Sequence, residues 1–484
     1  MEQFQAALSF DDVLLVPQKS EVLPNDANIH SQLGSTIKLN IPIVSAAMDT
    51  VSEANLAIAL ARQGGLGVIH RNMTIEEQAN MVKKVKRSEN AVIEQPFTVK
   101  PDITVYQLIE VMQEHGVAGF PVVDDNHYLL GIVTSRDIRY LDNKSLQVKS
   151  VMTPIDRLVT AKKGSTVEAA REILYKHRIE KLPLIDESGR LAGLITGADI
   201  EKTRTFLDAA KDSQGHLLCG SAVGVGEDYL DRAQALVESG ADALFIDAAT
   251  GHTKRVMDVV THLAQDFDLP IVAGNVVTAQ GAKDLKESGA SVVKVGVGPG
   301  SICTTRIISG AGMPQLTAIL NVVEYAKSNG LGVIADGGIR YSGDAVKALA
   351  AGADLVMLGS MLAGTAESPG EIIYNQGRRY KSYRGMGSLG AMAKGSKDRY
   401  GQNSSGKLVA EGVEGRVAYK GPLENVIFQM IGGIRSGMGY TGAATLADLR
   451  EKAQFVTLTP GGLKESHVHD IVMTSEPGNY QALS

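Results

Sequence analysis

Cys303 is the side chain of this sequence best placed to act as a nucleophile. It lies in the glycine-rich segment 297–306, VGPGSICTTR, which follows the apolar run 291–295. A thiolate is strongly nucleophilic and needs only local help to ionise. The alternative is a cysteine packed in a core as a small hydrophobic side chain. The permissive glycine backbone and the neighbouring hydroxyl groups favour the reactive interpretation.

The size and composition of the chain limit what it can be. Its 484 residues predict two or three domains, and 44% hydrophobic with 21% charged residues is typical of a globular protein. A formal net charge of −6 gives no reason to expect a nucleic-acid partner. Because no apolar run has membrane-spanning length and the first residues do not resemble a signal peptide, we expect a cytoplasmic protein. Cys219, inside the apolar run 217–223, is expected in the core.

A repeated strand and helix pattern must position Cys303. Short apolar segments, each followed by a helical pattern, occur at 41–45, 66–69, 217–223, 243–246, 271–273, 291–295, 332–335 and 355–358. Glycine at the end of a helix followed by a near-continuous apolar strand is typical of parallel sheets. We therefore predict an α/β protein built on a (β/α)8 TIM barrel. The chemistry of such barrels lies at the carboxyl ends of the strands, and Cys303 follows the sixth run.

An internal duplication interrupts the barrel pattern after the second apolar segment. The segments 120–124 and 131–138 recur at 182–186 and 193–200 without insertions, which indicates two copies of one small unit. They resemble a tandem pair of CBS motifs over 91–205, with repeats at about 91–145 and 153–205. This resemblance implies a regulatory module that binds adenine or guanine nucleotides through Thr134, Asp137, Thr196 and Asp199. The alternative is a structural unit whose aspartates cap helices.

The segment around Cys303 resembles the active-site loop of the inosine 5'-monophosphate (IMP) dehydrogenase and GMP reductase family. The likeness extends through the motifs IPIVSAAMDTV at 41–51, GNV at 274–276, ADGGI at 335–339, YRGMGS at 383–388 and DRY at 398–400. It implies that residues 1–90 and 206–484 form one catalytic barrel. It also implies NAD-dependent oxidation of IMP to XMP, the committed step of guanine nucleotide synthesis. GMP reductase lacks the Arg399-Tyr400 pair, which favours the dehydrogenase.

The physical chemistry of the substrate agrees with that reading. Carbon C2 of hypoxanthine is electrophilic, so the Cys303 thiolate can add to it, a hydride can leave to NAD, and the covalent thioimidate then needs water. Barrel rules place the phosphate after strands seven and eight, at Gly338, Gly359 and Ser360, with hydroxyls from Ser301 and Tyr383. A tight turn is the alternative role for Gly338. By resemblance, Asp336 binds the ribose, and the remaining substrate contacts are Met48, Gly385, Met386, Gly387 and Glu411.

The region from about 376 to 421 is glycine-rich, polar and without clear periodicity, and a loop this long is usually functional or disordered. The resemblance assigns it to a mobile flap that enters the dinucleotide site after NADH leaves. Arg399 and Tyr400 would then activate water, with Thr305 and Glu411 as a second proton relay. A guanidinium is normally always charged, so Arg399 needs surroundings that make proton sharing accessible. A solvated loop charge is the alternative.

The expected cofactors are NAD and potassium. The segment 385–390 matches G-x-G-x-x-G, but 378–384 does not read as a buried strand and no βαβ unit surrounds it. NAD is instead expected across the barrel mouth, at Asp247, Asn275, Gly296 and Gly298. Potassium is implied by resemblance, bound by carbonyls of Gly298, Gly300 and Cys303 and, from a neighbouring subunit, by Glu465, Ser466 and His467. This implies a homotetramer, or an octamer of two tetramers; an exposed polar tail is the alternative for 465–469.

Overall fold

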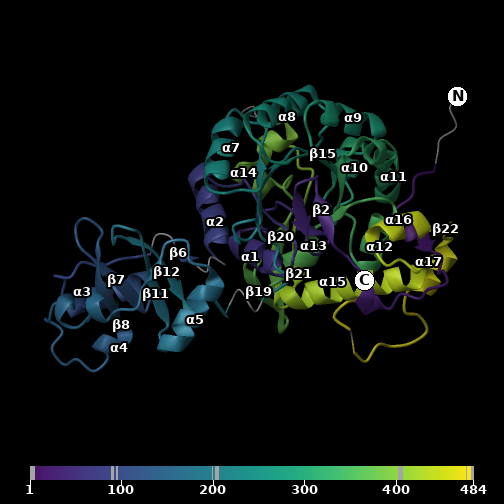
Figure 1. Cartoon of the computed structure of the whole chain (residues 1–484). Helices are drawn as coiled ribbons and strands as arrows, with labels where there is room; N and C mark the ends of the chain where they lie inside the picture. Colours follow the sequence, from purple (N-terminus) through teal and green to yellow (C-terminus); the bar gives the residue numbers. More distant parts are fainter. Residues whose placement is uncertain are drawn as a thin grey trace. The chain divides into compact units, whose positions relative to one another are not determined.

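The computed structural model describes residues 6–88, 92–93, 96–198, 200–201, 206–401, 407–475 and 477–480. The chain forms two compact units (Figure 1). The larger comprises Met1–Ser88 and Asp208–Ser484, and the smaller comprises Glu89–Leu207. Among the described residues, no helix is long and apolar enough to cross a bilayer.

The larger unit contains an eight-stranded parallel sheet that closes into a barrel, so the predicted fold class is confirmed. The sheet closes through a parallel bridge between Val44 and Leu66. Its strands, in spatial order, are β4 (Ile43–Ser45), β18 (Leu355–Leu358), β17 (Gly332–Asp336), β16 (Val292–Val295), β15 (Ile271–Val276), β14 (Ala243–Ile246), β13 (Cys219–Val223) and β5 (Gly67–Ile69). The surrounding helices are α1 (Ala54–Arg62), α2 (Ile75–Arg87), α7 (Tyr229–Glu238), α8 (Lys254–Asp266), α9 (Ala279–Glu287), α11 (Gln315–Ala326), α12 (Ser342–Ala350) and α15 (Leu423–Thr441) (Figure 1).

The barrel interior is packed with apolar side chains from alternate positions of its strands. A hairpin of β2 (Ser31–Leu33) and β3 (Ile37–Leu39) packs against the same core, which includes Phe245 and Met357. Cys219 is fully buried, and burial raises the pKa of its thiol to about 12, so its expected place in the core is confirmed. This packing leaves the other end of the strands free to carry the site.

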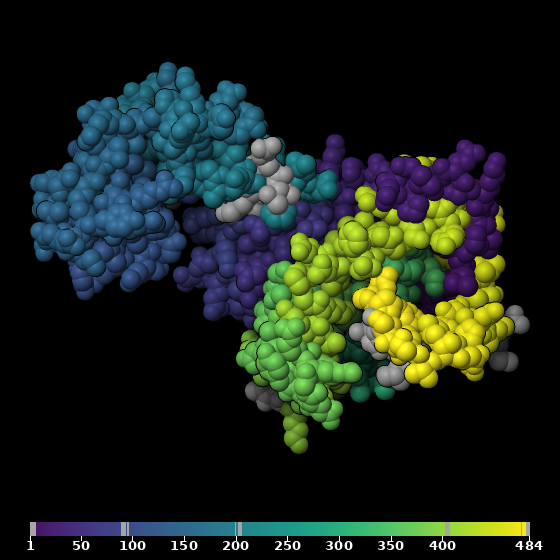
Figure 2. Space-filling view, turned by 90° about the horizontal axis from the view of Figure 1, so that it is seen from below, coloured from purple at the N-terminus to yellow at the C-terminus, as the bar shows by residue number. Residues whose placement is uncertain are grey.

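The ends of the larger unit meet in one small sheet. Strand β1 (Val13–Leu15) pairs antiparallel with β22 (Phe455–Thr457), near α16 (Leu446–Lys452) and α17 (Pro460–Ser466). Figure 2 shows the purple N-terminal residues beside the yellow-green and yellow C-terminal residues. This pairing ties residues 455–457 to the N-terminal strand.

The smaller unit consists of two copies of one arrangement. Helix α3 (Val105–His115) precedes the hairpin of β7 (Gly119–Val123) and β8 (Leu129–Thr134); helix α5 (Val167–His177) precedes that of β11 (Lys181–Ile185) and β12 (Leu191–Thr196). Their sheets are completed by β9 (Thr153–Pro154) in the first copy, and by β6 (Val92–Ile93) and β10 (Ala161–Lys162) in the second.

The predicted nucleotide contacts of the first copy are engaged with one another. The Asp137 carboxylate accepts hydrogen bonds from the Thr134 amide at 2.7 Å and from its hydroxyl at 2.8 Å, capping α4 (Ser135–Ile138). This is the helix-capping role that the structural alternative predicts. Asp199 lies outside the described residues.

The region 376–421 is more regular than expected. It contains β20 (Arg378–Arg384) and β21 (Glu414–Ala418), which form an antiparallel sheet with β19 (Ile372–Asn375), and helix α14 (Leu389–Lys394). The segment 378–384 is therefore a strand, but Lys381 and Tyr383 are its only buried residues, so it is not a strand buried on both faces. Because this sheet is antiparallel, the G-x-G-x-x-G match still lacks the parallel unit that a dinucleotide fold requires.

Candidate active site

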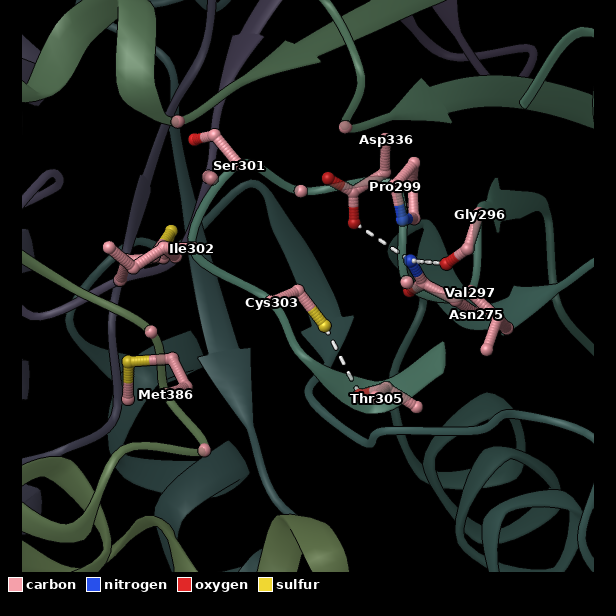
Figure 3. A pocket seen from close by; sticks show the side chains of 18 of the residues that line it. Asn275, Gly296, Val297, Pro299, Ser301, Ile302, Cys303, Thr305, Asp336 and Met386 are labelled. Carbon is pink, nitrogen blue, oxygen red and sulfur yellow. Dashed lines mark hydrogen bonds between the residues drawn. The ribbon is translucent and has the colours of Figure 1, made fainter. Parts of the chain in front are cut away.

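Cys303 lies in the loop between β16 and α10 (Thr305–Ser309), at the carboxyl end of the barrel (Figure 3). Its sulfur lies 3.1 Å from the Thr305 hydroxyl oxygen and 3.7 Å from the Glu411 carbonyl oxygen. The backbone before this loop requires a glycine at position 296. Gly296 has a φ of 139°, and a Cβ there would lie 2.4 Å from the Asp336 carbonyl oxygen. The loop thus presents a half-buried thiol to the cavity on a tightly packed backbone.

Most residues singled out from the sequence line a single cavity. Those that line it are Met48, Asn275, Gly296, Gly298, Gly300, Ser301, Cys303, Thr305, Asp336, Gly338, Gly359, Ser360, Tyr383, Gly385, Met386, Gly387, Arg399, Tyr400 and Glu411. Asp247 lines an adjoining cavity with Arg399 and Asp336. Segments remote in sequence therefore converge on the Cys303 thiol.

Three predicted residues lie elsewhere in this chain. Glu465 and Ser466 end α17, and His467 follows it. The His467 Nδ1 lies 3.1 Å from the Tyr480 hydroxyl, and its ring is edge-on to Tyr341. Glu465, Ser466 and His467 do not line the cavity that contains Cys303.

A backbone clamp joins the Cys303 loop to the segment before β21. The Thr304 amide donates to the Glu411 carbonyl at 3.0 Å, and Val413 donates to Ile302 at 3.1 Å. The Glu411 amide in turn donates to Gly387 at 3.0 Å. The nucleophile loop and the expected base-binding segment are thus held in register by main-chain hydrogen bonds.

Asp336, at the end of β17, belongs to a hydrogen-bond chain that sequence reasoning found only in part. The Asn275 side-chain amide donates to Asp336 Oδ2 and to the Gly296 carbonyl, both at 2.8 Å (Figure 3). Lys294 Nζ donates to Asn275 Oδ1 at 2.6 Å, and burial lowers the pKa of this lysine. A lysine within the apolar run 291–295 was the signal that could have identified Lys294 from the sequence.

The residues expected to bind the phosphate follow β17 and β18. Gly338 follows β17, and Gly359 and Ser360 join β18 to the short helix α13 (Ser360–Ala363). Tyr383 on β20 lines the same cavity, and burial raises the pKa of its phenol to about 12 despite a hydrogen bond with Ser301. Its hydroxyl therefore remains a neutral hydrogen-bond donor at physiological pH.

Arg399 and Tyr400 lie in a 3-10 turn, η6 (Ser396–Tyr400), and face the Cys303 side of the cavity. The Arg399 guanidinium forms an ion pair with Asp247. Burial lowers the pKa of Arg399, Tyr400 opposes this shift, and Arg71 adds to it. Within the part of the chain described, its buried Nε has no hydrogen-bond partner. Arg399 is therefore not a solvated loop charge.

A second ion pair fixes β20 to the loop after β4. Arg384 Nε donates to both Asp49 carboxylate oxygens at 3.1 Å, and Asn72 donates to Asp49 at 2.8 Å. Burial alone would raise the pKa of Asp49, but these hydrogen bonds bring it below its ordinary value of 3.8. A carboxyl with a depressed folded-state pKa contributes stability above its unfolded pKa, and this is lost as pH falls through the folded value.

We therefore expect Asp49→Asn to lower the melting temperature at pH 7, by about 2–4 °C per kcal/mol lost. The difference from the parent should shrink as the pH falls below about 4. Thermal unfolding over a pH series measures this. Asp258, whose pair with Lys254 is exposed, is the control, because Asp258→Asn should change the melting temperature little. A pH-independent difference for Asp49→Asn would contradict this assignment.

Comparisons with known proteins agree with this geometry. The model of the IMP dehydrogenase / GMP reductase domain matches residues 7–469. Inosine-5'-monophosphate dehydrogenase of Halalkalibacterium halodurans is 56% identical over 474 residues, covering 98% of both chains. That of Aquifex aeolicus is 55% identical over 483 residues, covering 99% of this chain and 98% of its own.

Among solved structures, GMP reductase C318A from Trypanosoma brucei in complex with guanosine 5'-monophosphate superposes with a TM-score of 0.91. It is 41% identical and covers 97% of this chain and 99% of its own. The matches span both units rather than the barrel alone. The chain therefore belongs to the inosine-5'-monophosphate dehydrogenase family of NAD-dependent enzymes, which oxidise IMP in guanine nucleotide synthesis.

Proposed function

We propose that this protein oxidises IMP to XMP through a covalent thioimidate on Cys303 that is then hydrolysed. The observation that carries the proposal is the sharing of one cavity by Cys303, Thr305, Arg399, Tyr400 and Glu411. A nucleophile and groups suited to moving protons from water face the same space. Two reactions at one carbon require such a site.

In the first step the Cys303 thiol releases its proton to solvent, and the resulting thiolate adds to C2 of the purine. The C2–H bond then breaks with both electrons departing as hydride, for which NAD supplies the acceptor when bound. The Cys303 thiol donates a hydrogen bond to the Thr305 hydroxyl oxygen at 3.1 Å, and this contact orients the sulfur before it reacts. In the second step water attacks C2 and gives one proton to Arg399 in its neutral guanidine form, which the surroundings that lower the pKa of this group make accessible. The C–S bond breaks with both electrons going to sulfur, and the departing thiolate takes up a proton from solvent to restore the thiol.

Separate groups of residues hold the phosphate, the base and the ribose of the substrate. Backbone amides at Gly338, Gly359 and Ser360, with the Ser301 and Tyr383 hydroxyls, bind the phosphate. Met48, Gly385, Met386, Gly387 and Glu411 surround the base. Asp336 accepts from the ribose hydroxyls, because Asn275 fixes one of its oxygens and leaves the other free to face the cavity.

Asp336→Ala is expected to raise the Kd for IMP by about 10-fold to 150-fold, the loss of one hydrogen-bonded charged group. Isothermal titration calorimetry measures it. Asp354 on the opposite end of the β17–β18 pair is the control, since it binds Arg450 and the Val333 amide. Asp354→Asn should lower stability without changing the Kd for IMP. If the two substitutions change the Kd for IMP equally, Asp336 does not bind the ribose.

Residues 376–421 act as the flap, and NAD and Arg399 compete for Asp247. In this structure Asp247 is engaged by Arg399, so the nicotinamide ribose reaches Asp247 and Asn275 only when Arg399 has moved away. Because the flap closes only after NADH has left, Arg399 enters the site after the redox step is complete, and the two reactions are separated in time. Gly296 and Gly298 then line the path of the dinucleotide.

The potassium site and the oligomer rest on the same loop. Gly298 has a φ of 77°, a conformation in which successive carbonyls can face a common point, and carbonyl oxygens suit a monovalent cation. Gly298, Gly300 and Cys303 would hold potassium with Glu465, Ser466 and His467 of the partner subunit in a homotetramer.

Residues 91–205 would form a tandem CBS unit that binds adenine or guanine nucleotides.

The mechanism is tested by trapping. Mass spectrometry of the protein quenched during turnover with IMP, NAD and potassium should show a purine adduct on the Cys303 peptide. The likeness to a GMP reductase structure makes reduction of GMP the second candidate. The place of Arg399 and Tyr400 in the cavity favours hydrolysis instead. Ammonia release from GMP with NADPH would reverse that preference.

A further inference from the structure

Four charged side chains form a continuous chain of ion pairs beside the cavity, and two of them had no role predicted from the sequence. Arg71 Nε donates to Asp247 Oδ2 at 3.0 Å, and its Nη1 and Nη2 donate to the two oxygens of Asp398 at 3.1 and 2.8 Å. Arg399 pairs with the other oxygen of Asp247. Side-chain exposure is 8% for Arg71, 6% for Asp247 and 15% for Asp398, so water screens these charges weakly.

The members of the network come from different parts of the fold. Arg71 follows β5 and Asp247 follows β14, both on the barrel, whereas Asp398 and Arg399 belong to the turn η6. A Cβ at Gly224 would lie 2.8 Å from Arg71 Cζ, so the guanidinium lies flat against the backbone after β13. Arg71 is therefore held in a fixed slot on the barrel, and it uses three donors to join Asp247 to a residue of the flap.

We propose that Arg71 is a positioning residue that holds the flap closed through Asp398 and thereby sets the balance between the hydrolytic site and dinucleotide binding. The inference rests on the proposed function of the flap and names the barrel group that acts on it. When the dinucleotide takes Asp247, Arg399 must leave, but Arg71 can still neutralise Asp247. The Arg71–Asp398 contact exists only with the flap in place, so it favours one state selectively.

Asp398→Asn tests the contact from the flap side, because it removes one charge while keeping the shape and leaving Asp247 intact. Stopped-flow absorbance separates the burst of NADH, which reports hydride transfer, from the steady state, which reports hydrolysis. We expect an unchanged burst rate and steady-state turnover about 10-fold to 100-fold slower. A non-reducible NAD analogue should bind Asp398→Asn more tightly than the parent, because the flap competes less for its site.

Arg71→Gln and the double variant Arg71→Gln/Asp398→Asn complete a double-mutant cycle. The double variant should be no slower in hydrolysis than Arg71→Gln alone, because both substitutions remove one contact. Arg71→Lys keeps the charge but not the fork that reaches both carboxylates, so it should fall between the parent and Arg71→Gln. Arg450, a partly buried arginine that pairs with Asp354 at the opposite end of the barrel strands, is the control. Arg450→Gln should lower the melting temperature without changing the ratio of burst to steady-state rates.

Two results would overturn the proposal. One is that Asp398→Asn slows burst and steady state equally; the other is that the effects of Arg71→Gln and Asp398→Asn on hydrolysis add in the double variant. Failure of the underlying function would look different, because the parent itself would then show neither an NADH burst nor a Cys303 adduct.

Discussion

Replacing Cys303 with alanine is expected to abolish NADH formation while IMP still binds. The substitution removes the atom that forms the bond to C2, and loss of a covalent nucleophile lowers kcat on the order of 10⁶-fold. The phosphate and ribose subsites use other residues of the cavity, such as Ser360 and Asp336. The Kd for IMP measured by calorimetry should therefore stay within about threefold of the parent value, the scale of a single weak contact.

The second cysteine supplies the matched control. Cys219 is fully buried in β13, and its pKa is raised to about 12 by burial. Cys219→Ala should retain the NADH burst and lose some stability, since it leaves a small cavity in the barrel. Turnover by Cys303→Ala at a rate near that of the parent would show that hydride leaves a non-covalent complex, and the thioimidate mechanism would be wrong.

The barrel could be predicted because its strands depend on simple patterning. Parallel strands buried on both faces need near-continuous apolar runs, as in 243–246 and 355–358, and both are strands at those bounds. The ends of the strands were predicted less accurately than their positions in the sequence. β15 continues to Val276 rather than stopping at 273, with an irregular register at Gly274–Val276. Glycine and asparagine are uncommon in strands, so the sequence Gly274-Asn275 does not indicate that the strand continues.

Strand β20 of the flap was missed because its two buried side chains, Lys381 and Tyr383, carry polar groups. Lys381 is buried on β20, and its ammonium donates to the carbonyls of Thr365, Ala366 and Ser368. A buried lysine satisfied by backbone carbonyls looks, in sequence, like an exposed loop charge. Hydropathy patterns therefore could not separate β20 from a mobile loop.

The cavity residues could be predicted from short motifs, but their charged partners could not. Resemblance to one family pointed to Cys303 and Arg399 because those motifs are specific. Arg71 lies more than three hundred positions from Asp398 in the sequence, and nothing in either segment indicates that they meet. The closure of the barrel brings the partners of such long-range ion pairs together. These pairs can therefore be identified only when the order of the strands is known.

Arg399→Gln is expected to separate the two reactions. The Cys303 loop and the substrate subsites remain, so hydride transfer and the first NADH should form at close to the parent rate. Hydrolysis should slow by about 10²-fold to 10⁴-fold, the usual contribution of a positioned general base. The covalent adduct should then accumulate, and quenched-flow mass spectrometry would find it on most of the protein during the steady state.

The pH dependence gives the sharper test of the role of Arg399. Because burial lowers the pKa of its guanidinium, the proton-accepting form becomes more populated as pH rises, and parent hydrolysis should increase toward alkaline pH. Arg399→Gln should lose that increase. Lys397→Gln, an exposed charge in the same turn, should keep both the rate and the pH profile. If the hydrolysis rate of Arg399→Gln still rises toward alkaline pH as in the parent, Arg399 is not the general base. The Thr305 and Glu411 pair, which lies in the same cavity, would then be the group that activates water.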